Sequence, residues 1–255
     1  MGSALLKGWL DRGVKSIAVV EPKPSAQLRK LAKAKKIALF AAPTAVKRKP
    51  LVCVVAIKPQ VLKGEAVTLA EFAQGGALMI SIAAGTSIVA LTRAWGRKAR
   101  IIRAMPNTPG AIGQGITGIY AAKGVTAADK KRATSLLAAL GETVWVAKED
   151  LIDSVTAVSG SGPAYLFLMT EALTEAGIAE GLPRDQAEKF ARATVSGAGA
   201  LLAADKSPAS ALREAVTSPG GTTAAALAVL MAEGGLLPLM KRAVRAARKR
   251  AEELR

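Results

Sequence analysis

Short apolar runs alternate with helical patterns along the first 150 residues of the chain. The runs at 51–57 and 77–82 are uninterrupted by charge, which is typical of strands buried on both faces. Amphipathic stretches at 4–12 and 25–36 predict helices. Further short strands are expected at 16–21, 100–105, 117–122 and 142–146. This alternation predicts an α/β domain built on a mainly parallel sheet that helices cover on both faces.

The pattern changes after residue 153, where long helical stretches rich in alanine and leucine replace the strands. We therefore predict two domains, an α/β domain over residues 1–153 and an all-α domain over residues 154–255. A domain of about 100 residues cannot cover helices that are apolar on nearly all sides. We expect the second domain to form at least a homodimer through these helices.

Histidine is absent from the sequence, and Cys53 is its single cysteine. The lack of histidine excludes Ser-His-Asp triads, Cys-His pairs and the usual zinc ligand sets. One cysteine excludes an internal disulfide and points to a reducing compartment. Because Cys53 lies within an apolar run, we expect an inert core residue and no metal site.

The formal net charge of +17 results from 36 Lys and Arg residues against 19 Asp and Glu residues. Such a basic surface is compatible with nucleic acid, with an anionic ligand or with solubility alone. Aromatic residues make up only 4% of the chain, too few for the stacking platforms of proteins that bind single strands. We therefore expect no nucleic-acid partner.

The uncharged segment 72–92 is long enough to cross a bilayer. It contains several Gly, Ser and Thr residues that mark turns, so we interpret it as a buried strand followed by a loop. No targeting segment is evident at the start of the sequence. We expect a cytoplasmic protein without a membrane partner.

Five motifs occur in a fixed order along nearly the whole chain. They are AIKPQ at 56–60, ISIAAG at 80–85, RAMPNTPGAIGQG at 103–115, SGSGPAY at 159–165 and VTSPGGTTAAAL at 216–227. Each motif is weak alone, but five in register are specific, and with them the chain resembles the pyrroline-5-carboxylate reductase family. The resemblance implies a Rossmann-like N-terminal domain and a helical domain that interlocks with that of a partner. It also implies reduction of 1-pyrroline-5-carboxylate to L-proline, the last step of proline synthesis, with NADPH or NADH.

The start of the sequence departs from the family pattern. The family opens with a strand and a G-x-G-x-x-G turn, whereas this sequence begins Met-Gly-Ser-Ala-Leu-Leu, with Gly2 matching the third glycine. The first two glycines let the backbone reach a pyrophosphate, and the strand lies mid-sheet. We therefore expect a start site assigned about ten residues late or a truncated form, with weaker dinucleotide binding.

The remaining cofactor elements follow the carboxyl ends of the predicted strands, where ligands bind in doubly wound sheets. From this placement and from the resemblance to the family, the residues assigned to the cofactor are Gly2, Ser3, Glu21, Lys23, Ala56, Ile57, Lys58, Pro59, Ala83, Ala84 and Gly85. Glu21 has the spacing of an acid that binds the ribose 2′-hydroxyl of NAD, although a solvated turn residue is an equal alternative. Lys23, with Ser25 and Arg29, offers a site for the 2′-phosphate of NADP. Both cofactors remain open.

The segment 218–223, Ser-Pro-Gly-Gly-Thr-Thr, precedes a helical run. Its glycines free the backbone, so successive amides at the helix start can point at one anion such as a carboxylate. The residues assigned to the substrate are Ser218, Gly220, Gly221, Thr222 and Thr223 of this segment and, by resemblance to the family, Glu149. By resemblance, the Thr223 hydroxyl also has a catalytic role at the ring nitrogen. An ordinary capped helix and, for Glu149, a surface acid at a helix start are the alternatives.

Two other functions remain open on the sequence alone. A related reductase with the same two domains would act on another imine or on a β-hydroxyacid, and the SPGGTT segment separates it from the family above. A non-catalytic dimeric scaffold or a nucleic-acid-associated protein agrees with the charge and with the missing dinucleotide turn. Steep salt dependence of binding to random DNA duplex would favour this scaffold or nucleic-acid-associated protein over a reductase.

Overall fold

The computed structural model describes the backbone of all 255 residues and every side chain except those of Pro59 and Lys63. The chain forms two compact units, of which unit 1 comprises residues 1–160 and 247–255 and unit 2 comprises residues 161–246. The boundary expected at residue 153 therefore lies within unit 1. Residues 154–160 stay with unit 1 because the helix that they continue packs on its sheet.

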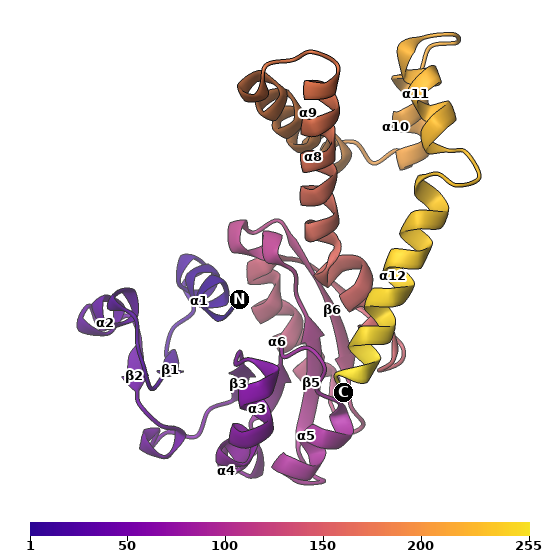
Figure 1. The fold of residues 1–255 in the computed structure, drawn as a ribbon. Coiled ribbons are helices and arrows are strands. Elements are labelled where there is room, and N and C mark those ends of the chain that lie inside the picture. Colours follow the sequence, from indigo (N-terminus) through magenta and orange to yellow (C-terminus); the bar gives the residue numbers. More distant parts are fainter. The chain divides into compact units, whose positions relative to one another are not determined.

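Unit 1 contains two sheets (Figure 1). The larger has the order β3-β4-β5-β6-β7, and the smaller pairs β1 with β2. The strands are β1 Ala18–Val20, β2 Ala38–Phe40, β3 Val52–Val55, β4 Leu78–Ser81, β5 Arg100–Met105, β6 Gly115–Ala121 and β7 Gly141–Trp145. All neighbours are parallel except β5 and β6, which are antiparallel. The prediction of a mainly parallel sheet is confirmed, but neither its division nor the antiparallel pair was predicted.

Helices cover both faces of the larger sheet. The α-helices of this unit before residue 160 are α1 Gly2–Asp11, α2 Ala26–Lys33, α3 Pro59–Glu65, α4 Ala70–Gln74, α5 Ile88–Trp95, α6 Ala127–Leu137 and α7 Leu151–Val155. Short 3-10 segments are η1 Pro43–Ala45, η2 Ala66–Leu69, η3 Thr108–Ile112 and η4 Ala138–Leu140, and η5 Thr156–Gly160 is a π-turn. Successive side chains of β4 point to opposite faces of the sheet and contact different helical layers. Leu78 and Ile80 pack against α1 and α6, whereas Met79 packs against α3, α4 and α5.

Strand β3 is an edge of the larger sheet, and its side chains are less buried than its sequence predicts. Leu51 is 80% exposed and Val52, Cys53 and Val54 are half-buried, although LVCVVAI predicts a strand covered on both faces. That prediction is wrong because β3 pairs with β4 alone and is therefore an edge strand, while β1 pairs with β2 in the smaller sheet. Helix α1 spans the interruption, since Leu5 packs in the core of the larger sheet and Leu6 in that of the smaller sheet.

Unit 2 is helical, as its sequence predicts. Its helices are α8 Gly162–Ala179, α9 Arg184–Ala204, α10 Ala209–Ala215, α11 Thr222–Leu230 and α12 Leu236–Glu253, the last of which ends within the residues of unit 1. Helices α8 and α9 pack together as a hairpin. Large apolar side chains remain exposed on this unit, among them Phe167 at 64% and Val229 at 73%. This is the unburied apolar surface from which dimerisation was expected.

The uncharged segment 72–92 comprises the end of α4, the buried strand β4 and the start of α5. This arrangement agrees with the interpretation of the segment as a strand and a loop. Among the described residues, no helix combines the length and the apolar character needed to cross a membrane.

Candidate functional site

The start of α1 lies at the carboxyl end of β3. A Cβ built on Gly2 would be 3.1 Å from the Cβ of Ala56, so the structure brings the first assigned cofactor residues, Gly2 and Ser3, beside the AIKPQ segment. Met1, the N-cap of α1, makes no side-chain capping bond. The amides of the first turn of α1 are therefore available to an anion at this edge of the sheet. Ala56, Ile57 and Lys58 are exposed there, and the side chain of Pro59 lies outside the described residues.

The turn after β4 carries the assigned residues Ala83, Ala84 and Gly85. Ala83 is 6% exposed, and its amide donates to Ser81 Oγ at 3.3 Å. Gly85 is buried and has a φ of +65°, a conformation that favours glycine. A Cβ on Gly85 would lie 2.9 Å from both the Cβ and the carbonyl oxygen of Leu254. Glycine is therefore required at position 85 within unit 1, because Leu254, directly after α12, packs against it.

Glu21 follows β1 and takes part in a local turn. Its Oε1 accepts a hydrogen bond from the Lys23 amide at 3.0 Å, and its own amide donates to the carbonyl oxygen of Phe40 at 2.9 Å. Lys23 is exposed beside it. Ser25 and Arg29, the other two candidates for a 2′-phosphate site, already have local partners. Ser25 Oγ caps α2, and Arg29 donates to the carbonyl oxygen of Pro24.

Glu149 has two partners in unit 1. Its Oε1 accepts from Arg103 Nη1 at 2.8 Å and from the amide of Ile88, the first residue of α5, at 2.7 Å. Arg103 lies within β5, and only 3% of its side chain is exposed. Glu149, which the sequence assigned to the substrate, thus binds a buried arginine and the start of α5 through its Oε1. Sequence reasoning did not single out Arg103, although an arginine inside the apolar run RIIRAM is a signal that a buried carboxylate pairs with it.

Asp153 forms a second buried ion pair near this one. Its Oδ2 is 2.7 Å from Nη2 of Arg255, and only 2% of the Asp153 side chain is exposed. The two groups are close but not aligned as a hydrogen bond. Burial raises the pKa of Asp153, and the charges of Arg255 and Arg103 offset only part of this effect. The charge of Arg255 is therefore one of the few interactions that offset the burial of the Asp153 carboxyl group.

The assigned substrate loop lies between α10 and α11 in unit 2. Gly220 has a φ of +71°, and the amide of Gly221 donates to the carbonyl oxygen of Ser218 at 3.1 Å. Gly221 is the N-cap of the nine-residue helix α11 and supplies no side-chain cap. The amides of Thr222 and Thr223 lie in the first turn of α11, where the sequence predicts an anion site, and that role stays a prediction.

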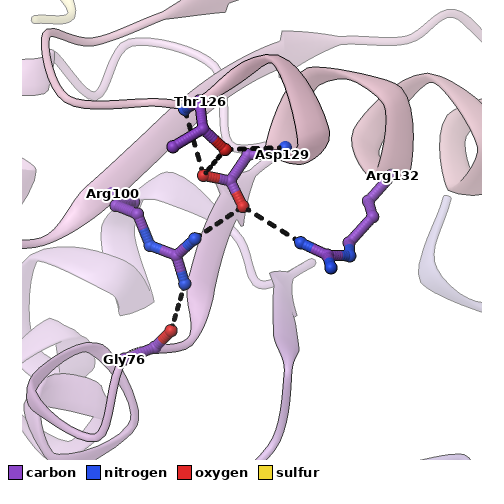
Figure 2. Close-up of polar contacts among 5 residues, drawn as sticks. All are labelled: Gly76, Arg100, Thr126, Asp129 and Arg132. Atoms are coloured by element: carbon purple, nitrogen blue, oxygen red, sulfur yellow. Dashed lines mark hydrogen bonds and ion pairs between the residues drawn. The ribbon is translucent and has the colours of Figure 1, made fainter.

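A third polar cluster surrounds Asp129 at the amino ends of β4 and β5, opposite to their carboxyl ends (Figure 2). Asp129 Oδ2 accepts from the amide and the hydroxyl of Thr126 at 3.1 and 2.8 Å, and Thr126 Oγ1 accepts in turn from the amide of Asp129. Asp129 Oδ1 is 2.6 Å from Arg100 and 3.5 Å from Arg132. Arg100 also donates to the carbonyl oxygen of Gly76. Because ligands bind at the carboxyl ends of such strands, this cluster stabilises the fold.

Burial would raise the pKa of Asp129, but the hydrogen bonds from Thr126 and the charged group of Arg100 outweigh it and hold the pKa below its usual range. The described residues contain no group of three or more Asp, Glu, Cys or His side chains able to hold a metal ion.

Two family models match this sequence. Residues 149–254 match the model described as pyrroline-5-carboxylate reductase dimerisation, and residues 1–85 match NADP oxidoreductase coenzyme F420-dependent. The first match covers the helices whose apolar side chains are exposed, so residues 149–254 are a dimerisation domain and the chain is a homo-oligomer.

A pyrroline-5-carboxylate reductase of Pseudomonas aeruginosa is 37% identical over 255 residues, which cover all of this chain and 93% of that protein. The chain belongs to the pyrroline-5-carboxylate reductase family. A Synechocystis reductase of the same name is 45% identical over 206 residues, which cover 80% of this chain and 74% of that protein.

Two solved structures extend this family relationship to the fold. The Coxiella burnetii pyrroline-5-carboxylate reductase superimposes with a TM-score of 0.90 at 35% identity and covers 99% of this chain and 94% of its own. The Plasmodium falciparum pyrroline carboxylate reductase, solved with NADP bound, has a TM-score of 0.82 at 27% identity over 100% of this chain and 94% of its own. The Rossmann-like N-terminal region and the helical C-terminal region predicted from the sequence are confirmed.

Proposed function

We propose that this chain reduces 1-pyrroline-5-carboxylate to L-proline with NADPH or NADH. The observation that carries the proposal is the loop 218–223, which ends in an α11 N-terminus without a side-chain cap. A small ring that bears one carboxylate matches such a site, because several backbone amides then share one anionic group. The family relationship and the NADP-bound relative support the same reaction.

The residues of unit 1 fit a dinucleotide. The uncapped first turn of α1 lies beside Ala56 and offers amides to a pyrophosphate, and the turn 83–85 is built of small residues. Glu21 and Lys23, at the end of β1, are the groups that would meet the adenosine ribose. Lys58 and the backbone of 56–59 are assigned to the ribose and nicotinamide. The reduced nicotinamide supplies a hydride to the C5 carbon of the imine.

In the substrate loop, the amides of Thr222 and Thr223 hold the carboxylate and Ser218 adds a hydroxyl, while Gly220 and Gly221 shape the turn, since the Gly221 amide donates to the carbonyl oxygen of Ser218. The Thr223 hydroxyl is assigned to the ring nitrogen, where it supports the protonated form while the adjacent carbon is reduced. A protonated imine needs no strong acid, so the absence of histidine is compatible with the reaction. In this account, Glu149 acts through α5, since its Oε1 is bound to Arg103 and the Ile88 amide. A cytoplasmic location is part of the proposal and is supported by the single cysteine.

Steady-state oxidation of NADPH and of NADH on addition of 1-pyrroline-5-carboxylate tests the reaction. Gly221→Val places a Cβ against Ser218 Oγ, which must turn away, and 3.2 Å from the carbonyl oxygen of Ser218, so the Ser218 hydroxyl leaves its position and the KM for the substrate should rise. Gly234→Val is the matched control, because nothing lies within 4 Å of a Cβ at Gly234 in the same unit. Equal activity of the two variants would contradict the assignment of the loop.

Thr223→Val tests the hydroxyl separately from the loop. Removing one hydrogen bond to a charged group should lower kcat/KM about tenfold to hundredfold, and Thr223→Ser should restore most of it. Full activity of Thr223→Val would remove the catalytic role from Thr223. A wild-type protein that binds NADPH but leaves 1-pyrroline-5-carboxylate unchanged would refute the proposed function.

A further inference from the structure

We propose that the end of α12 is a positioning element for the cofactor, acting on the turn after β4. We call residues 247–255 the tail and residues 82–87 the β4 turn. The inference rests on the proposed function, because the β4 turn carries Ala83, Ala84 and Gly85, which are assigned to the nicotinamide. Both segments belong to unit 1, although they lie far apart in the sequence.

The first observation is a backbone contact between the tail and the β4 turn. A Cβ on Gly85 would meet the Cβ and the carbonyl oxygen of Leu254, each at 2.9 Å. Leu254 therefore lies against the main chain of the turn, with no space for even a methyl group between them. Ala251, one helical turn earlier in the tail, is 6% exposed, so the tail is packed over more than its last residue.

The second observation is the buried ion pair that fixes the tail. Arg255 Nη2 is 2.7 Å from Oδ2 of Asp153, which is almost fully buried in α7. Helix α7 packs on β5 and β6, so Asp153 is a fixed point of the sheet layer. Breaking a buried pair by removing one partner leaves the other charge uncompensated, which makes the position of the tail sensitive to Arg255.

The third observation is that the other end of the β4 turn is held by the same part of unit 1. Glu149 Oε1 accepts from the amide of Ile88, immediately after the turn, and from the buried Arg103. Asp153 also interacts electrostatically with Arg103. The β4 turn is thus held by Leu254 at Gly85 and by Glu149 at Ile88, and the two supports converge on one group of charges around Arg103 and Asp153. Such supports decide how well a loop matches its ligand before the ligand binds.

Three single variants test the tail: Leu254→Gly, which removes the Cβ that meets Gly85, Arg255→Ala and Arg255→Lys. Arg250→Ala is the matched control, because Arg250 lies in the same tail but pairs with Glu253 on the exposed side. The Kd for NADPH is measured directly by titration without substrate, and kcat and both KM values are measured by NADPH oxidation. Hydrogen exchange of the amides of residues 83–88 is followed in the cofactor-free protein.

Leu254→Gly and Arg255→Ala should raise the Kd and the KM for NADPH by about threefold to thirtyfold, the range for residues that act on a site through a packed contact. The kcat and the KM for 1-pyrroline-5-carboxylate should stay nearly unchanged, exchange at 83–88 should accelerate, and Arg255→Lys should recover most of the affinity. Arg250→Ala should behave as wild type.

Unchanged NADPH affinity and unchanged exchange in both Leu254→Gly and Arg255→Ala would overturn the inference. A fall in kcat together with a rise in both KM values would also overturn it, because the tail would then serve only general stability. If wild-type protein binds NADPH but does not reduce 1-pyrroline-5-carboxylate, the proposed function fails, whereas the binding and exchange measurements still decide the role of the tail.

Discussion

Replacing Asp129 by alanine is the sharpest test of how unit 1 is stabilised, because every polar contact of this side chain is defined (Figure 2). The Asp129 carboxylate is fully buried and completes a capping box with Thr126. Loss of such a cap costs about 1 kcal/mol. The ion pair with Arg100, whose side chain is 31% exposed, adds about 2 kcal/mol, the value of a hydrogen bond to a charged group. Together these losses predict a decrease of about 3 kcal/mol in the free energy of unfolding.

Urea unfolding followed by circular dichroism at fixed protein concentration measures this change, since the concentration affects the stability of an oligomer. Thr126→Ala should cost about 1 kcal/mol, because it removes only the cap. Arg132→Ala is the control, since its guanidinium is 3.5 Å from Asp129 and 53% exposed, so its loss should cost less than about 0.5 kcal/mol. An Asp129→Ala penalty below about 1 kcal/mol, or an equal penalty for Arg132→Ala, would refute this reasoning.

The lowered pKa of Asp129 means that its stabilising effect is present above its unfolded pKa of about 4 and is lost as the pH falls through the lower folded-state value. Urea midpoints measured across this acid range should therefore fall less for Asp129→Asn than for wild type, and parallel curves would contradict this. Burial raises the pKa of Cys53 to about 12, so iodoacetamide should label the native protein slowly and the urea-unfolded protein fast, as checked by mass spectrometry. Equal rates would show that the thiol is accessible. Phe167 on α8 is 64% exposed within the dimerisation domain, so Phe167→Glu should shift the oligomer toward monomer in light scattering, and an unchanged mass would place the interface elsewhere.

Much of unit 1 could be predicted because strand positions depend on residues close together in the sequence. The run 100–105 coincides with β5, and the other predicted strands overlap β1, β3, β4, β6 and β7. In β4, the alternation of Leu78, Met79 and Ile80 also specifies which side chains meet which helical layer. What this pattern could not show is which strands become neighbours. The same apolar run that predicts a covered strand is only half-buried in β3, since its burial depends on a partner strand and not on its own residues.

The candidate site divides in the same way. The glycines of 220–221 and the lack of a side-chain cap on α11 follow from local sequence, and the structure places a positive φ at Gly220. The partners of Glu149 do not follow from local sequence. A carboxylate in the segment KEDLID looks the same whether it is solvated, bound to a ligand or paired with a buried arginine. Only the fold brings Arg103 and the Ile88 amide to it.

The amino-acid sequence alone determined the two-part architecture, the positions of the strands of unit 1 other than β2, and the Ser-Pro-Gly-Gly-Thr-Thr turn, because backbone preference and the period of apolar residues act over a few neighbouring positions. The tertiary structure alone decided that the sheet is divided between β1 and β3, that Glu149 pairs with Arg103, and that Leu254 packs against Gly85. Each of these features joins segments far apart in the chain, and the free energy of such contacts depends on burial and alignment that exist only once the whole unit has folded.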